Sequence, residues 1–217
     1  GYLRPIADNL LPDLEQLFAA EEATENQRVS AANAFADYAA KDKATLTRLL
    51  TLATPEQYAI LYPLVEGAGA DGVRDSLLNL TRKVPTDDMS LQDRVSLGQR
   101  RASAAITLLR LGERDSILEI LRINDDPESL SQFVSRCHSR DVTAEELLEC
   151  LESCDEARKA VSGAAKKLES RVMYGLLLAL GNYSLDQLPA ESRDRWVVRV
   201  ADLYENDPTS AIHGASG

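Results

Sequence analysis

A helical phrase that returns along the chain constrains the fold more than any other feature of the sequence. Its first copy places Arg, Ala-Ala, Phe and Tyr at helical spacing over residues 28–38, and a second copy repeats the pattern 73 positions later, over residues 101–111. The Leu-Leu-x-Leu-Gly ending at 108–112 occurs again at 177–181. Helical units that repeat at long spacing are typical of an α-solenoid, in which each unit buries its apolar face by stacking on its neighbours.

The composition favours an all-α fold. The chain has 217 residues, of which 44% are hydrophobic and only 5% aromatic, so helices packed through Ala and Leu fit better than a sheet sandwich. We therefore predict one domain over residues 1–217, a right-handed α-solenoid of helix pairs. The segment 83–90 has no apolar periodicity and is the candidate internal boundary.

The net charge and the cysteine content argue against several kinds of partner and against a disulfide-linked fold. The net charge of −11 opposes binding to phosphate backbones and anionic membranes, so we expect no nucleic-acid partner and no membrane contact. No apolar run is long enough to span a bilayer. Three cysteines, an odd number, form no disulfide framework and favour a reducing, cytoplasmic setting.

Apolar spacing and capping residues predict the individual helices. Thr54-Pro55 marks one helix start, Pro63 is expected to bend or shorten that helix, and Thr143 with Glu146 forms a capping-box pattern. Gly112 suits a left-handed helix exit. The ranges with the clearest patterns are 8–22, 25–40, 46–52, 55–67, 90–111 and 190–204.

The last residues, 207–217, begin like another repeat helix. Asp207 is the expected cap and Pro208 the expected first-turn residue, but the pattern covers only about two helical turns. A repeat without its second helix leaves an apolar face unburied. We therefore expect residues 1–217 to be an excised part of a longer protein.

Candidate metal ligands and other single sites are weak in this sequence. Cys137, His138, Cys150 and Cys154 include soft-metal ligand types, but their spacing differs from the usual zinc pairs, and Cys150 with Cys154 fits a packed helix face better. His213 has no thiol or paired carboxylate nearby. No phosphate-binding glycine loop or catalytic triad spacing is present, so we predict no catalytic, cofactor-binding or metal-binding residue and no enzyme activity for this segment.

Clusters of charge leave further alternatives open. An acidic run could bind a cation or a basic partner, although a solvated helix face is the simpler interpretation. It comprises Glu145, Glu146, Glu149, Glu152, Asp155 and Glu156. A basic group could receive an acidic loop; it comprises Arg94, Arg100, Arg101, Arg110 and Arg114. Trp196 beside Arg193, Arg195 and Arg199 could stack a nucleic-acid base, but Trp196 also fits the apolar stripe of its own helix.

One pattern in the sequence resembles HEAT-type repeats. It is Arg-x-x-Ala-Ala-x-x-Leu-x-x-Leu-Gly, ending at Gly112, and it is followed by the phrases at 115–118 and 126–128. The resemblance implies that the helix pairs of the solenoid are HEAT- or armadillo-like. Two repeat units in each long offset would reconcile the spacing. A second resemblance covers most of the chain. It is carried by the phrases at 2–5, 34–39, 58–63, 188–191 and 206–215.

Those phrases resemble the helical region of planctomycete-type bacterial multidomain proteins. Such proteins join a serine/threonine kinase to a domain similar to formylglycine-generating, sulfatase-modifying enzymes. The resemblance implies a non-catalytic scaffold or protein-interaction module that links or regulates these flanking domains, with a protein or peptide on its concave surface. It transfers no site, since the motifs of neither enzyme occur here. The alternative is a helical-repeat enzyme or nucleic-acid binder that uses Trp196 and the neighbouring arginines.

Overall fold

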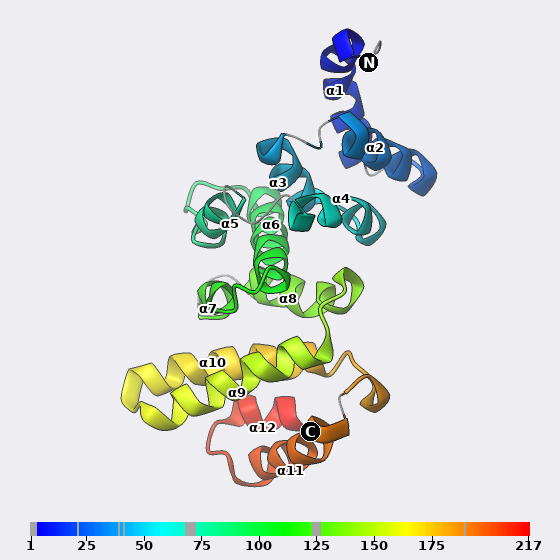
Figure 1. The fold of residues 1–217 in the computed structure, drawn as a ribbon. Coiled ribbons are helices and arrows are strands. Elements are labelled where there is room, and N and C mark those ends of the chain that lie inside the picture. Colours follow the sequence, from blue (N-terminus) through cyan, green and yellow to red (C-terminus); the bar gives the residue numbers. More distant parts are fainter. Residues whose placement is uncertain are drawn as a thin grey trace.

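A computed structural model shows an all-helical chain (Figure 1). It describes residues 4–20, 22–38, 40, 42–67, 73–122, 127–188 and 190–217, and no β-strand occurs among them. The α-helices are α1 (Arg4–Ala19), α2 (Glu25–Tyr38), α3 (Lys43–Leu52), α4 (Pro55–Gly67), α5 (Arg74–Thr81), α6 (Leu91–Arg110), α7 (Asp115–Leu121), α8 (Pro127–Arg136), α9 (Ala144–Ala160), α10 (Gly163–Leu180), α11 (Ala190–Asn206) and α12 (Ser210–Ser216). Two 3-10 helices, η1 (His138–Arg140) and η2 (Leu185–Gln187), complete the set. The all-α prediction is confirmed.

The helices follow one another through space in their order along the chain. Figure 1 shows the N-terminus beside α1 at one end and the C-terminus beside α11 and α12 at the other. Helices adjacent in sequence pack as pairs, such as α1 with α2, α5 with α6, α9 with α10 and α11 with α12. Successive pairs are joined by contacts of α2 with α4, α3 with α6, α6 with α8 and α10 with α12. Each helix therefore contacts mainly its near neighbours along the chain.

Two apolar cores run through this series, and α6 contributes to both. Ala104 and Leu108 of α6 belong to the N-terminal core, which includes Phe18, Phe35 and Tyr58. The other face of α6 belongs to the C-terminal core, through Ala102, Ala105, Ile106 and Leu109. The second copy of the repeated phrase thus has an apolar residue on nearly every side. A helix that is buried on all sides has a sequence of nearly continuous small and branched residues, most of them apolar, as residues 102–109 have.

Local chemistry explains several helix ends. Ser90 caps α6 by accepting a hydrogen bond from the Asp93 amide, and Gly112 leaves the helix with a φ of +86°. Glycine adopts this left-handed conformation most readily because it lacks a Cβ. Thr143 and Glu146 form the predicted capping box at the start of α9. The segment 83–90 connects α5 to α6, and these two helices pack directly against each other.

Several predicted boundaries were wrong. The first helix spans Arg4–Ala19 rather than 8–22 and contains Pro12. The range of α4, Pro55–Gly67, agrees with the prediction; Pro63 lies inside this helix without shortening it, and Val65 beyond the proline is buried in the N-terminal core. Residues 39, 41, 69, 125, 126 and 189, and the side chain of Leu10, were also part of the predictions and lie outside what the structure describes.

The final helix begins later than predicted. Asp207 does not cap a helix that starts at Pro208; α12 begins at Ser210, and its N-cap residue is Thr209. The Asp207 carboxylate instead accepts a hydrogen bond from the Thr209 amide at 2.8 Å and pairs with Arg158 at 2.6 Å. The later start of α12 is explained by this ion pair. The buried Arg158 needs a counter-ion, because an unpaired buried charge is costly, and Asp207 provides it.

Candidate functional site

An apolar groove lies at the C-terminal end of the helix series. Its volume is about 620 Å³, and its walls come from the end of α10, from η2, from α11 and from α12. Several of its apolar side chains are open to solvent: Leu185 is 62% exposed, Val197 51% and Tyr204 47%. Exposed apolar side chains gathered in one hollow mark an interaction surface more often than isolated ones do. We refer to this hollow as the terminal groove.

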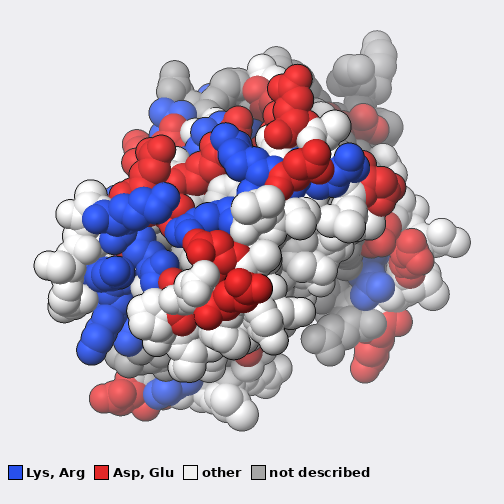
Figure 2. All heavy atoms as spheres, turned by 90° about the horizontal axis from the view of Figure 1, so that it is seen from below, with Lys and Arg blue, Asp and Glu red and all other residues white. Residues whose placement is uncertain are grey.

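Charged side chains of both signs lie at the end of the molecule that carries the terminal groove. Viewed from the α11–α12 end, acidic and basic side chains lie intermixed over part of the surface, beside an extended uncharged area (Figure 2). The described lining of the terminal groove itself includes no charged side chain, so apolar contact dominates what the groove can bind. None of the described helices combines the length and apolar character needed to cross a bilayer.

Trp196, the residue proposed for base stacking, faces the interior. It is 5% exposed and belongs to the C-terminal core, and its indole Nε1 donates a hydrogen bond to Glu152 at 3.3 Å. One edge of the ring reaches the wall of the terminal groove. A stacking platform needs an open ring face. The geometry therefore favours a core role for this side chain.

The arginines around Trp196 have carboxylate partners. Arg195 pairs with Glu152, and Arg199 pairs with Asp155 at 2.6 Å and also with Asp202. Arg193 lies 3.7 Å from Asp194. These pairings neutralise the positive charge that a nucleic-acid backbone would need.

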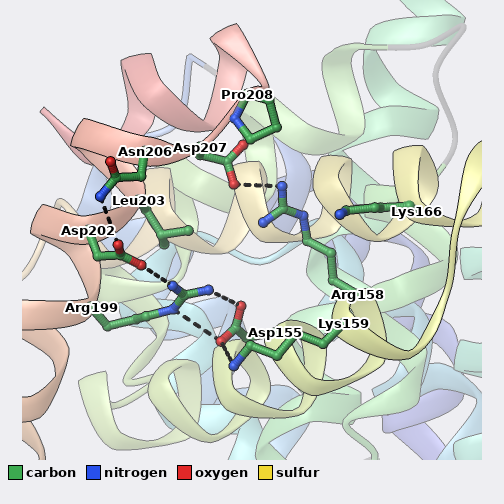
Figure 3. A pocket seen from close by; sticks show the side chains of 10 residues that line it. All are labelled: Asp155, Arg158, Lys159, Lys166, Arg199, Asp202, Leu203, Asn206, Asp207 and Pro208. Atoms are coloured by element: carbon green, nitrogen blue, oxygen red, sulfur yellow. Dashed lines mark hydrogen bonds and ion pairs between the residues drawn. The ribbon is translucent and has the colours of Figure 1, made fainter.

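Ion pairs join α9 to α11 and to the connection between α11 and α12, as Figure 3 shows. Arg158 of α9 bonds Asp207 at 2.6 Å, and their side chains are only 7% and 4% exposed. The Nε of Arg158 also donates to the Ser170 hydroxyl at 2.9 Å. We call the Arg158–Asp207 and Arg199–Asp155 pairs the α9 clamp.

The α9 clamp changes the proton affinity of its carboxylates. Burial would raise the pKa of Asp155, but hydrogen bonds from Arg199 and Lys159 outweigh burial and lower it below the ordinary value. The pKa of Asp207 is also lowered, because the Thr209 amide and Arg158 together outweigh the effect of burial. Both groups are therefore ionised at neutral pH and serve to fix the last helix pair in place.

Carboxylates of the acidic run, predicted as a possible cation or partner site, form contacts within the protein. Glu146 belongs to the capping box, Glu149 pairs with Arg114, and Glu152 pairs with Arg195. No group of three or more metal-ligand side chains comes together in the described parts of the chain. Carboxylates used in this way are not free to bind a cation as a cluster.

Among the described residues, the cysteines and histidines do not come together as a metal-binding group. All three cysteines are buried and free, and burial raises the pKa of Cys150 and of Cys154 to about 12. His138 contacts Gln187 at 3.2 Å and the Tyr183 ring, whereas the His213 ring contacts Tyr204. Protonated, buried thiols neither ligate metals nor act as nucleophiles.

The predicted basic group is also dispersed. Arg101 is fully buried and donates to the Thr81 carbonyl, Arg110 lies 3.7 Å from the Tyr62 ring centroid, and Arg94 binds carbonyls of the 83–90 segment. Arg100 alone of this group reaches a second cavity, where it meets Arg136 and Arg140. Sequence reasoning missed Arg136 and Arg140 because they come from a different helix and a 3-10 turn.

Comparisons with protein-family models, with curated proteins and with solved structures found no match for this chain.

Proposed function

We propose that this chain is a non-catalytic, HEAT-like α-solenoid that links and orients neighbouring domains of a larger bacterial protein. The order of packing supports the solenoid, since successive helix pairs contact mainly the pairs next to them. The observation that carries the proposed function is the terminal groove, an apolar hollow of about 620 Å³ left open at one end of the series. Following the resemblance in the sequence, the linked domains are a serine/threonine kinase and a formylglycine-generating-enzyme-like domain.

The occupant that we propose for the terminal groove is an amphipathic helix from a flanking domain of the same polypeptide. Elsewhere in the series the apolar face of one pair is covered by the next: Trp196, Leu203 and Ile212 of the last pair complete the core over α9 and α10. Among the described residues, no helix covers the outer face of α11 in this way, and Val197 and Val198 are 51% and 70% exposed. A further helix would continue the existing interface with the same chemistry.

Hydrogen exchange tests this proposal. Amide exchange of α11 should be slower in a polypeptide that includes the flanking sequence than in residues 1–217 alone, because a docked helix reduces local opening. Val197→Asp should abolish the added protection, since it places a charge in the apolar contact. Val84→Asp is the matched control, as Val84 is 59% exposed and lies outside the groove. Equal exchange of α11 in the two polypeptides would refute the docking.

A second assay addresses the absence of catalysis. Purified residues 1–217 should show no phosphotransfer from ATP to a protein substrate and no oxidation of a sulfatase-derived cysteine peptide. Turnover of either substrate, lost on substitution of a residue in this chain, would contradict the scaffold proposal.

A further inference from the structure

A second cavity, distant in sequence from the terminal groove, gathers positive charge. It lies where the end of α3 and start of α4 meet α6, α8 and η1, and its volume is about 360 Å³. Arg100, Arg136 and Arg140 line it together with the hydroxyls of Thr54, Ser96 and Ser139. No Asp or Glu is among the described residues of its wall. We call this cavity the arginine pocket.

Arg140 is the deepest of these side chains. It is 1% exposed, and its Nη1 and Nη2 donate to the carbonyls of Leu50 and Ala53 at 3.2 and 2.6 Å. Its Nε is buried without a hydrogen-bond partner. Backbone carbonyls hold the guanidinium in place but carry no net charge to neutralise it. Burial, together with the nearby charge of Arg136, lowers the pKa of Arg140 to about 10.

Arg136 is oriented by neutral partners. Its Nε donates to the Gln132 side-chain oxygen at 2.7 Å, and its Nη1 donates to the Ser103 hydroxyl at 3.3 Å. Glu128 interacts with Arg136 electrostatically but not by a direct hydrogen bond; Gln132 lies between them and donates to the Glu128 carboxylate at 2.8 Å. Among the described residues Arg136 forms no direct ion pair, so its positive charge remains directed at the pocket.

Arg100 has the fewest partners of the three arginines. It is half-buried, its Nε is enclosed without a hydrogen-bond partner, and it makes no hydrogen bond or ion pair with any described residue. Two guanidinium groups without carboxylate partners, beside a third that is buried, are unusual in a chain of net charge −11. Like charges held together in a partly enclosed site repel one another unless an anion joins them.

We propose that the arginine pocket binds a phosphate monoester. Guanidinium forks match the oxygens of a phosphoryl group. The hydroxyls of Thr54 and Ser96 can donate further hydrogen bonds, whereas the Ser139 hydroxyl already donates to the Arg136 carbonyl at 3.2 Å. Arg100 and Arg136 together supply two positive charges, which balance the charge of a phosphate monoester at neutral pH. A cavity of about 360 Å³ also lies within the range of small-ligand sites, about 300–1,000 Å³. Arg140, buried in the wall of the pocket, acts as a positioning residue, and its positive charge adds to the electrostatic attraction for the phosphate.

Isothermal titration with three probes tests the proposal. The probes are inorganic phosphate, a phosphoserine peptide and the same peptide without its phosphate. Wild-type protein should bind the phosphate-bearing probes saturably at one site and should not bind the unmodified peptide. Tighter binding of the phosphopeptide than of inorganic phosphate assigns a phosphorylated protein as the source, and equal binding assigns a small free phosphate.

Variants separate a built site from general charge attraction. Arg100→Gln and Arg136→Gln should each weaken phosphate binding by about tenfold or more, the effect of losing a charge-assisted hydrogen bond. Arg100→Gln should fold normally, because it removes no interaction with the described residues. Arg171→Gln is the matched control: Arg171 is exposed on α10, and its loss changes the net charge equally. It should leave affinity within about twofold.

Two results would overturn the proposal. One is the absence of saturable binding of either phosphate probe up to the millimolar range at low salt. The other is an equal loss of affinity in Arg100→Gln and Arg171→Gln, which would mean that phosphate responds only to overall charge. Neither result bears on the terminal groove, so this test and that of the scaffold are independent.

Discussion

Replacing Asp207 with asparagine tests whether the α9 clamp holds the last helix pair in place. Asp207 and Arg158 are 4% and 7% exposed, so removing the carboxylate charge leaves a cation enclosed without its counter-ion. Breaking such a buried pair costs about 3–5 kcal/mol. Asparagine keeps an oxygen that can accept from Arg158, and a hydrogen bond to a charged group is worth about 1.5–3 kcal/mol. We therefore expect Asp207→Asn to lower the free energy of unfolding by about 2 kcal/mol.

Urea unfolding, with native-state hydrogen exchange of α11 and α12, measures this loss. A double-mutant cycle with Arg158→Met should give a coupling energy of more than about 1 kcal/mol, because each single change strands the other partner. Asp194→Asn is the control: the Asp194 side chain is 90% exposed, and the change should cost less than about 0.5 kcal/mol. A loss below about 0.5 kcal/mol for Asp207→Asn, or additive effects in the cycle, would refute the reasoning.

The same pair fixes the sign of a pH effect. The pKa of Asp207 lies below its ordinary value of 3.8 in the folded protein, because the Thr209 amide and Arg158 outweigh the effect of burial. The pair therefore contributes its full stability above that ordinary value, and the contribution is lost as the pH falls through the lowered pKa. The stability difference between wild type and Asp207→Asn should shrink in the same acid range. A difference that persists unchanged there would contradict the assignment.

Three further predictions follow from single positions. Gly112→Ala should cost about 1 kcal/mol in chemical unfolding because Gly112 has a φ of +86°, whereas Gly67→Ala, also at a helix end in open space, should cost less; equal costs would contradict the strain argument. Thr143→Ala should cost about 1 kcal/mol by removing the capping box of α9, and an unchanged unfolding midpoint would contradict that role. Cys150 and Cys154, whose pKa burial raises to about 12, should react with a thiol reagent at mildly alkaline pH only after unfolding, and rapid reaction in the native state would show that they are accessible.

Sequence reasoning identified most of the helices because their signals are local. The Thr143–Glu146 capping box, the exit at Gly112 and the apolar stripe around Trp196 each depend on residues within a few helical turns. Boundaries failed where tertiary contacts decide them. The position of Asp207 before Pro208 suits a helix cap, but its carboxylate pairs with the buried Arg158, which is distant in sequence.

The arginine pocket could not have been predicted from the sequence. Arg100 belongs to α6, Arg136 ends α8 and Arg140 ends η1, and no spacing rule links these positions. Arg140 reaches the carbonyls of Leu50 and Ala53 across a sequence separation of about ninety residues. Only the packing of α6 against both α3 and α8 brings these groups to one cavity.

The position of α6 also determines how cooperatively the molecule unfolds. In a simple stack each unit can open while the others stay intact, and stability is close to a sum over units and their interfaces. Here one helix is the common wall of both cores, so the loss of order in either half exposes apolar surface belonging to the other. We expect the two halves to unfold together as one cooperative unit, with fraying confined to α1–α2 and α11–α12. A disturbance at one end of the chain would thus be felt at the other as a change in stability, without any shift in the shape of the helices between them.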